Sequence, residues 1–111
     1  MIPESFDYQR ASSVSEAISL LQQYGDSAKI LAGGHSLVPT MKLRLATPET
    51  LIDIGGIAEL KYINDKGDYL AIGAGTTHWA IESSDLVSQK APALSQAAGQ
   101  IGDVQVRNRG T

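Results

Sequence analysis

The chain has 111 residues, which allows one domain, or one domain and a fragment of another. Apolar residues make up 42% of it, a content typical of a folded domain and not of a disordered one. Nine basic and twelve acidic side chains give a net charge of −3, without the basic excess of nucleic-acid-binding or anionic-membrane-binding proteins. There is no cysteine for disulfides or iron–sulfur clusters, no membrane span and no signal-peptide pattern, so we expect a cytoplasmic protein.

The first half of the chain alternates helical and strand patterns. Ser13 and Glu16 have the spacing of a capping box, and the apolar residues that follow predict a helix over 14–24 that ends at Gly25. Three further elements are expected: a buried strand over Lys29–Ala32, a short helix over Leu37–Leu43 and a second buried strand over Thr50–Ile54. A helix between two short apolar strands indicates a small parallel α/β unit over residues 1–55.

After Gly56 the pattern changes to that of an antiparallel hairpin. Tyr62–Asp65 and Tyr69–Gly73 flank a Lys66–Asp68 turn. Further helices are then expected over Trp79–Ser84 with Thr77 as cap, over Leu86–Lys90, and from Pro92 through Ala98. The predicted fold class is therefore α+β, with an α/β first subdomain (1–55) and the start of a second (56–111) that has an antiparallel sheet flanked by helices.

The loop Ala32–Ser36 is the strongest candidate for a binding site. Two glycines after a strand allow positive φ and a close approach of the backbone to a ligand. Unpaired N–H groups that converge in such a loop suit phosphate oxygens, and Ser36 adds a hydroxyl donor. From the residues alone, an ordinary strand-to-helix turn is an equally good interpretation.

Other chemistries find little support. The loop lacks the Gly-Lys-Ser/Thr of a Walker motif, and His78 replaces the third glycine of a dinucleotide fingerprint. Val38 stands where a nucleophile elbow around Ser36 needs glycine, which argues against a hydrolase. Since His35 and His78 are the only histidines and lie far apart in sequence, we expect neither a metal site nor catalytic residues.

Four other residues have simpler expectations. Asp53 follows a strand and is expected to cap the Gly55-Gly56 turn. Trp79 is expected in the core. Arg107 and Arg109 alternate in what we interpret as a strand, so both would point to the same face, where they either meet a phosphate or face solvent.

Taken together, four segments resemble one family. The chain is similar to the flavoprotein medium subunit of molybdenum hydroxylases, the carbon monoxide dehydrogenase and xanthine dehydrogenase family. The resemblance covers essentially the whole chain, in order. The segments that carry it are Ala32–Pro39, Leu51–Ile54, Gly73–His78 and Gln105–Thr111.

The resemblance implies an FAD-binding domain of the vanillyl-alcohol oxidase type (PCMH type), with FAD bound between subdomains. Two glycine loops would hold the pyrophosphate, and only the first residue of the second loop, a Thr-Ile-Gly-Gly loop in the family, is present. The resemblance also predicts that this is the truncated N-terminal portion of the subunit. The implied cofactor-binding residues are Ala32, Gly33, Gly34, His35, Ser36, Leu37, Thr76, Thr77 and Thr111.

The resemblance further implies a role in electron transfer within an oxidoreductase. A large subunit with a molybdenum cofactor would hydroxylate the substrate, and a small subunit with iron–sulfur clusters would pass electrons to FAD and on to an external acceptor. We expect the isolated chain to be inactive and to self-associate through exposed apolar surface. The alternative is a truncated, non-catalytic flavoprotein module with weak or no flavin binding.

Overall fold

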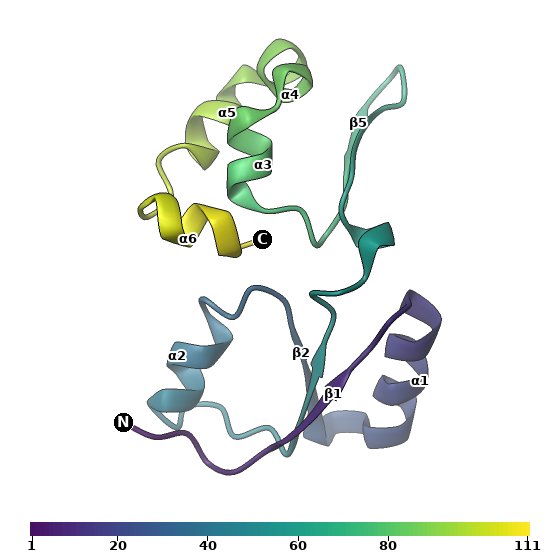
Figure 1. The fold of residues 1–111 in the computed structure, drawn as a ribbon, viewed down its shortest axis with the longest axis vertical. Coiled ribbons are helices and arrows are strands. Elements are labelled where there is room, and N and C mark those ends of the chain that lie inside the picture. The colour runs from purple at the N-terminus through teal and green to yellow at the C-terminus, as the bar shows by residue number, and fades with distance from the viewer. The chain divides into compact units, whose positions relative to one another are not determined.

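The computed structural model describes all residues from 1 to 111, which divide into two compact units, Met1–Ala58 and Glu59–Thr111. Figure 1 labels most of their helices and strands, and each unit is described by itself. A short 3₁₀ helix, Gly25–Ser27, lies inside the first unit, and another, Ala58–Leu60, lies where the first unit ends and the second begins. No helix of the structure has the length and apolar character needed to cross a membrane.

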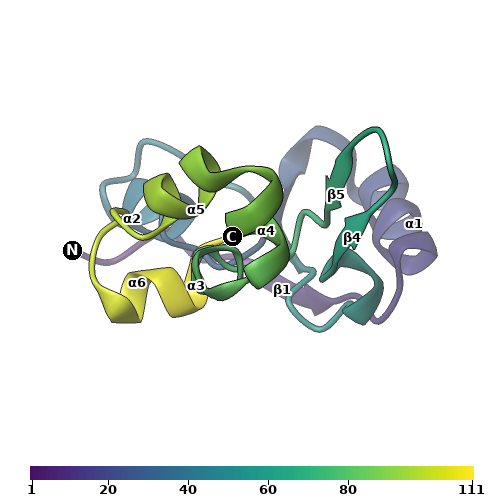
Figure 2. The same cartoon turned by 90° about the horizontal axis from the view of Figure 1, so that it is seen from above.

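The first unit is built on a three-stranded parallel sheet. Its strand order is β1 (Asp7–Arg10), β3 (Thr50–Asp53) and β2 (Ala28–Leu31). Helices α1 (Val14–Tyr24) and α2 (Leu37–Lys42) lie on opposite sides of the sheet in both views (Figures 1 and 2). The predicted parallel arrangement of the two apolar strands is confirmed, since β2 and β3 pair directly in parallel.

The capping prediction for α1 is confirmed at both ends. The Ser13 hydroxyl accepts a hydrogen bond from the N–H of Glu16 at 3.1 Å, and Gly25 ends the helix with φ of +59°. The Glu16 carboxylate, however, accepts from the N–H and hydroxyl of Ser12. The start of α1 is thus held by side chains from both of its neighbouring serines.

The central strand β3 carries the core of the first unit, with Leu51 and Ile52 buried. The prediction that Lys29–Ala32 is a buried strand is wrong in part, because β2 lies at an edge and leaves Lys29 and Ile30 exposed. Strand β1 was not predicted at all. Its residues, Asp7 to Arg10, are polar or amphipathic, so they lack the apolar run that identifies a buried strand.

The second unit contains a hairpin and four short helices. Strands β4 (Ile63–Asp65) and β5 (Leu70–Ile72) pair antiparallel, as predicted, and Ile63 lies opposite Ile72. The helices lie together, with the hairpin to one side of them (Figure 2). They are α3 (His78–Ser83), α4 (Asp85–Lys90), α5 (Pro92–Ala98) and α6 (Val104–Arg109).

Two predictions for the second unit are wrong. Arg107 and Arg109 belong to helix α6, which Asp103 caps by accepting a hydrogen bond from the N–H of Val106 at 3.0 Å. Residues two apart on a helix point to nearly opposite sides, so Arg107 is half-buried whereas Arg109 is exposed. Trp79, expected in the core, is 51% exposed on α3.

Candidate functional site

The loop between β2 and α2 has a backbone that only glycine adopts without strain. Gly33 and Gly34 have φ values of +72° and +85°. A Cβ on Gly34 would lie 3.1 Å from Cγ2 of Val38 and 3.3 Å from Cδ1 of Leu31. Gly34 is therefore required both by its conformation and by the close packing of its neighbours.

Three consecutive backbone donors of this loop have no partner in the chain. The first bonds of α2 run from Val38 N–H to the Gly34 carbonyl at 2.9 Å and from Thr40 N–H to the Ser36 carbonyl at 3.2 Å. The N–H groups of His35, Ser36 and Leu37 take part in none of these bonds. His35 and Ser36 are exposed to solvent. The hydroxyl of Ser36 makes no capping bond and remains able to donate.

One donor that the sequence predicted for this loop is not available. The N–H of Gly34 donates to the carbonyl of Ala32 at 2.8 Å, which closes a tight turn inside the loop. The N–H groups that remain available therefore lie nearer to the start of α2 than the sequence predicted. Unpaired N–H groups at such a place attract anions, because each carries a partial positive charge.

Asp53 lies beside this loop at the end of the neighbouring strand. It stands opposite Leu31, the last residue of β2, in the register of the sheet. Its Oδ1 accepts a hydrogen bond from the N–H of Gly55 at 2.8 Å, which confirms the predicted turn cap. Its Oδ2 accepts from the hydroxyl of Tyr8, and this bond raises the pKa of Tyr8.

Tyr8 is a residue that reasoning from the sequence missed. It belongs to β1, and its partner Asp53 is 45 residues away in the chain. Asp53 ends β3 at the carboxyl edge of the parallel sheet, which is where ligands bind in open α/β sheets, and Tyr8, in register with Leu51, reaches it from the neighbouring strand. Prediction of β1 would have been the only signal that placed Tyr8 near Asp53.

In the second unit, the two predicted threonines have structural partners. The Thr76 hydroxyl accepts from the N–H of Tyr62 at 3.2 Å and donates to its carbonyl at 3.1 Å, so it secures the hairpin. The Thr77 hydroxyl accepts from Ala80 N–H at 3.2 Å, which confirms it as the cap of α3. Both line an open, mainly apolar pocket of about 330 Å³; the other lining residues are Lys61, Tyr62, Ile63, Gly75 and Ala80.

Thr111, the last residue, is exposed, and the residue before it, Gly110, is hydrogen-bonded to α3. The carbonyl of Gly110 accepts a hydrogen bond from the N–H of His78 at 3.0 Å. Because Thr77 precedes His78 and Thr111 follows Gly110, this bond brings two of the predicted residues to the same end of α3. No group of three or more metal-ligating side chains occurs in the structure.

A glycine turn followed by consecutive N–H groups without a partner, at the carboxyl edge of a parallel sheet, is an arrangement suited to binding the phosphates of a nucleotide. Residues 4–111 match the model of a family described as the FAD binding domain in molybdopterin dehydrogenase. The chain belongs to this family, which confirms the resemblance predicted from the sequence.

The chain is also similar to individual members. It is 53% identical to the carbon monoxide dehydrogenase medium chain of Hydrogenophaga pseudoflava and 47% identical to subunit alpha of the 6-hydroxypseudooxynicotine dehydrogenase complex of Paenarthrobacter nicotinovorans. Both matches cover 100% of this chain, but 39% and 38% of the relatives. The structure of reconstituted carbon monoxide dehydrogenase from Oligotropha carboxidovorans matches with a TM-score of 0.97 at 47% identity, over 100% of this chain and 39% of that one.

Proposed function

We propose that this chain is the FAD-binding part of the medium subunit of a molybdenum-containing oxidoreductase, and that the loop Ala32–Leu37 binds the FAD pyrophosphate. The observation that carries the proposal is the run of free N–H groups on His35, Ser36 and Leu37 after the two positive-φ glycines. A pyrophosphate is an anion with several acceptor oxygens, so it fits a set of exposed donors.

Gly33 and Gly34 would serve this site by leaving room. Without a Cβ at either position, a phosphate can approach the backbone closely enough to reach the N–H groups beyond it. When bound, FAD supplies the redox chemistry, accepting electrons and passing them to an external acceptor, while the chain binds and orients it. Our proposed site also includes Thr76, Thr77 and Thr111, with Thr76 acting through the hairpin that its hydroxyl already secures.

We propose the partners that the resemblance to the family implies, a large molybdenum subunit and a small iron–sulfur subunit. Electrons would pass from the large subunit through the small one to FAD, and the absence of cysteine from this chain agrees with cluster ligation by another subunit. The names of the relatives support assembly into such complexes, and their substrates differ. We therefore propose that the large subunit determines the choice of substrate. We also propose that the fold of the complete domain is of the vanillyl-alcohol oxidase (PCMH) type.

A second candidate is a flavoprotein module that binds flavin weakly or not at all. It is favoured by the internal hydrogen bond of Gly34, which removes one donor from the loop.

The absorbance spectrum of the purified protein separates the two candidates. Flavin bands in the blue region that remain after gel filtration support the FAD-binding subunit. A colourless protein that is folded by circular dichroism, and that stays colourless after incubation with FAD, supports the non-binding module. Replacement of Gly34 with valine serves as the control, because a Cβ there would block the loop without altering the second unit.

A further inference from the structure

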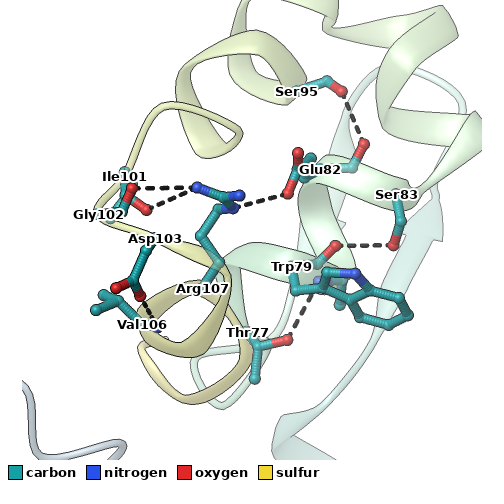
Figure 3. A network of polar contacts seen from close by, with 11 residues as sticks. Thr77, Trp79, Glu82, Ser83, Ser95, Ile101, Gly102, Asp103, Val106 and Arg107 are labelled. Atoms are coloured by element: carbon teal, nitrogen blue, oxygen red, sulfur yellow. Dashed lines mark hydrogen bonds and ion pairs between the residues drawn. The ribbon is translucent and has the colours of Figure 1, made fainter.

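Helix α6 is attached to α3 at two points that lie one helical turn apart. At the first, Nε of Arg107 lies 3.1 Å from Oε2 of Glu82. At the second, the carbonyl of Gly110 accepts from the N–H of His78 at 3.0 Å. His78 precedes Glu82 along α3, whereas their partners follow in the opposite order, Arg107 before Gly110. The two segments therefore run antiparallel. Figure 3 shows the first point in detail.

The Arg107–Glu82 pair is more buried than the Lys90–Asp65 and Arg44–Glu4 pairs. The side chains of Arg107 and Glu82 are 15% and 35% exposed, whereas the Lys90–Asp65 pair is 55% and 41% exposed. Partial burial reduces screening by water, so such a pair holds its geometry better than a surface pair does. The contact with Glu82 is an ion pair without the geometry of a hydrogen bond, since Nε of Arg107 has no hydrogen-bond partner. From Nη1 the same guanidinium donates hydrogen bonds to the carbonyls of Ile101 and Gly102, both at 3.3 Å (Figure 3).

Arg107 therefore joins three pieces of the second unit: α3, the loop before α6, and α6 itself. A planar guanidinium can make these contacts in different directions at once, which the single ammonium of lysine cannot. Ser95 adds to the same frame by donating from its hydroxyl to the carbonyl of Glu82 at 3.1 Å.

The second point of attachment is closely packed. Gly110 is buried, and a Cβ there would lie 3.1 Å from Cδ2 of His78 and 3.2 Å from the carbonyl oxygen of Val106. A rotation of α6 about its axis would break the contact with His78. The place of Gly110, and with it the direction in which Thr111 points, thus depends on the contacts that fix α6.

We infer that Arg107, through its ion pair with Glu82, is a positioning residue that holds Gly110 and Thr111 against the start of α3, beside Thr77. This inference rests on the proposed function, in which Thr111 and Thr77 belong to the flavin nucleotide site. Arg107 itself contacts no ligand in this account. It acts by fixing the backbone from which Thr111 presents its N–H and hydroxyl.

The exchange rate of the His78 amide hydrogen tests this directly in the 111-residue chain. His78 is the first residue of α3, where an N–H has no partner within the helix, so its protection reports on the Gly110 carbonyl. The amide of Ala91, which donates to Val87 at 2.7 Å, reports on the rest of the unit. The variants are Arg107→Met, Glu82→Gln and their combination, with Lys90→Met as control.

We expect each single variant to accelerate exchange at His78 by about tenfold or more and to leave Ala91 within about twofold. The double variant should be no worse than Arg107→Met, because both changes remove the same interaction. Lys90→Met should change neither rate. Unchanged exchange at His78, or equal acceleration at His78 and Ala91, would overturn the inference, since the pair would then be irrelevant or merely stabilising.

A titration with FAD separates this inference from the proposed function. Where the unaltered chain binds FAD, Arg107→Met should weaken the affinity by about tenfold or more and Lys90→Met should not. Unchanged affinity in Arg107→Met would overturn the positioning role. If the unaltered chain binds no FAD, the proposed function fails, and exchange at His78 still decides whether Arg107 positions the terminal residues.

Discussion

The carboxylate of Glu16 accepts hydrogen bonds from the hydroxyl of Ser12 at 2.6 Å and from its N–H at 3.3 Å. These bonds, the hydroxyl first, lower the pKa of Glu16 in the folded state. The unfolded chain therefore binds a proton more readily, so the stabilisation is present above the unfolded pKa and is lost as pH falls through the folded one.

Glu16→Gln should accordingly destabilise the protein more at neutral pH than in acid. We expect the difference in urea midpoint between the two proteins to shrink between about pH 7 and about pH 3. Ser12→Ala, which removes the principal donor, should reproduce part of this pH dependence. A difference that stays constant across the range would mean that the bonds to Ser12 do not influence the titration of Glu16.

Single residues were predictable where their partners are close in sequence. Thr77 caps helix α3 through a residue three positions away, and Asp53 caps a turn through a residue two positions away. Such bonds follow from residue type and spacing. Tyr8 and Arg107 were not, because their partners lie 45 and 25 residues away and depend on strand pairing and helix packing. The exposure of Trp79 likewise follows from which face of α3 meets α5 and α6.

Among the elements, α6 shows how a cap overrides a strand-like pattern. Val104, Val106 and the alternating arginines have the period of a strand. Asp103 nevertheless supplies a helix N-cap, and Arg107 and Arg109 lie in the last turn, where basic residues favour a helix. A segment of six residues is too short for periodicity to decide between the two.

Removal of this cap should destabilise α6. Asp103→Ala should lower the free energy of unfolding by about 1 kcal/mol, whereas Asp103→Asn, which keeps an acceptor oxygen, should cost much less. Chemical denaturation of the two variants beside the unaltered protein measures both values. Equal losses in the two variants would show that the charge of Asp103, and not its capping bond, holds the helix.

The sheet of the first unit was predicted in its pairing but not in its extent. Apolar content identified β3 and β2, and the helix between them implied parallel strands. An edge strand buries fewer side chains, so β1 left no comparable signal and β2 was given more burial than it has. Sequence reasoning therefore placed the glycine loop correctly after β2. It missed strand β1, and with it the contact between Tyr8 and Asp53.

At the scale of the whole molecule, the length of the relatives suggests how to strengthen binding. The chain spans 39% of the Hydrogenophaga pseudoflava medium chain. A fusion that continues this chain after Thr111 with the corresponding remainder of that relative should bind FAD at least tenfold more tightly. Each charge-assisted hydrogen bond gained is worth about 1.5–3 kcal/mol.

The same fusion should leave the first unit unchanged, because that unit has its own sheet and core. It should also reduce any concentration-dependent association, since exposed apolar side chains such as Trp79 and Ile101 favour contacts between copies. Calorimetric titration and analytical ultracentrifugation measure the two effects. Equal affinities for FAD in the chain and the fusion would show that nothing after Thr111 contributes to binding.

The central claim is that the glycine loop after β2 binds the phosphates of FAD, and titration of FAD into matched glycine variants tests it most directly. Gly34 and Gly67 have similar φ values, +85° and +89°, but a Cβ would meet neighbours only at Gly34. We predict saturable binding by the unaltered chain and by Gly67→Val, and affinity at least about tenfold weaker for Gly34→Val. Equal affinity in the Gly34 variant, or no binding by the unaltered chain, would contradict the account.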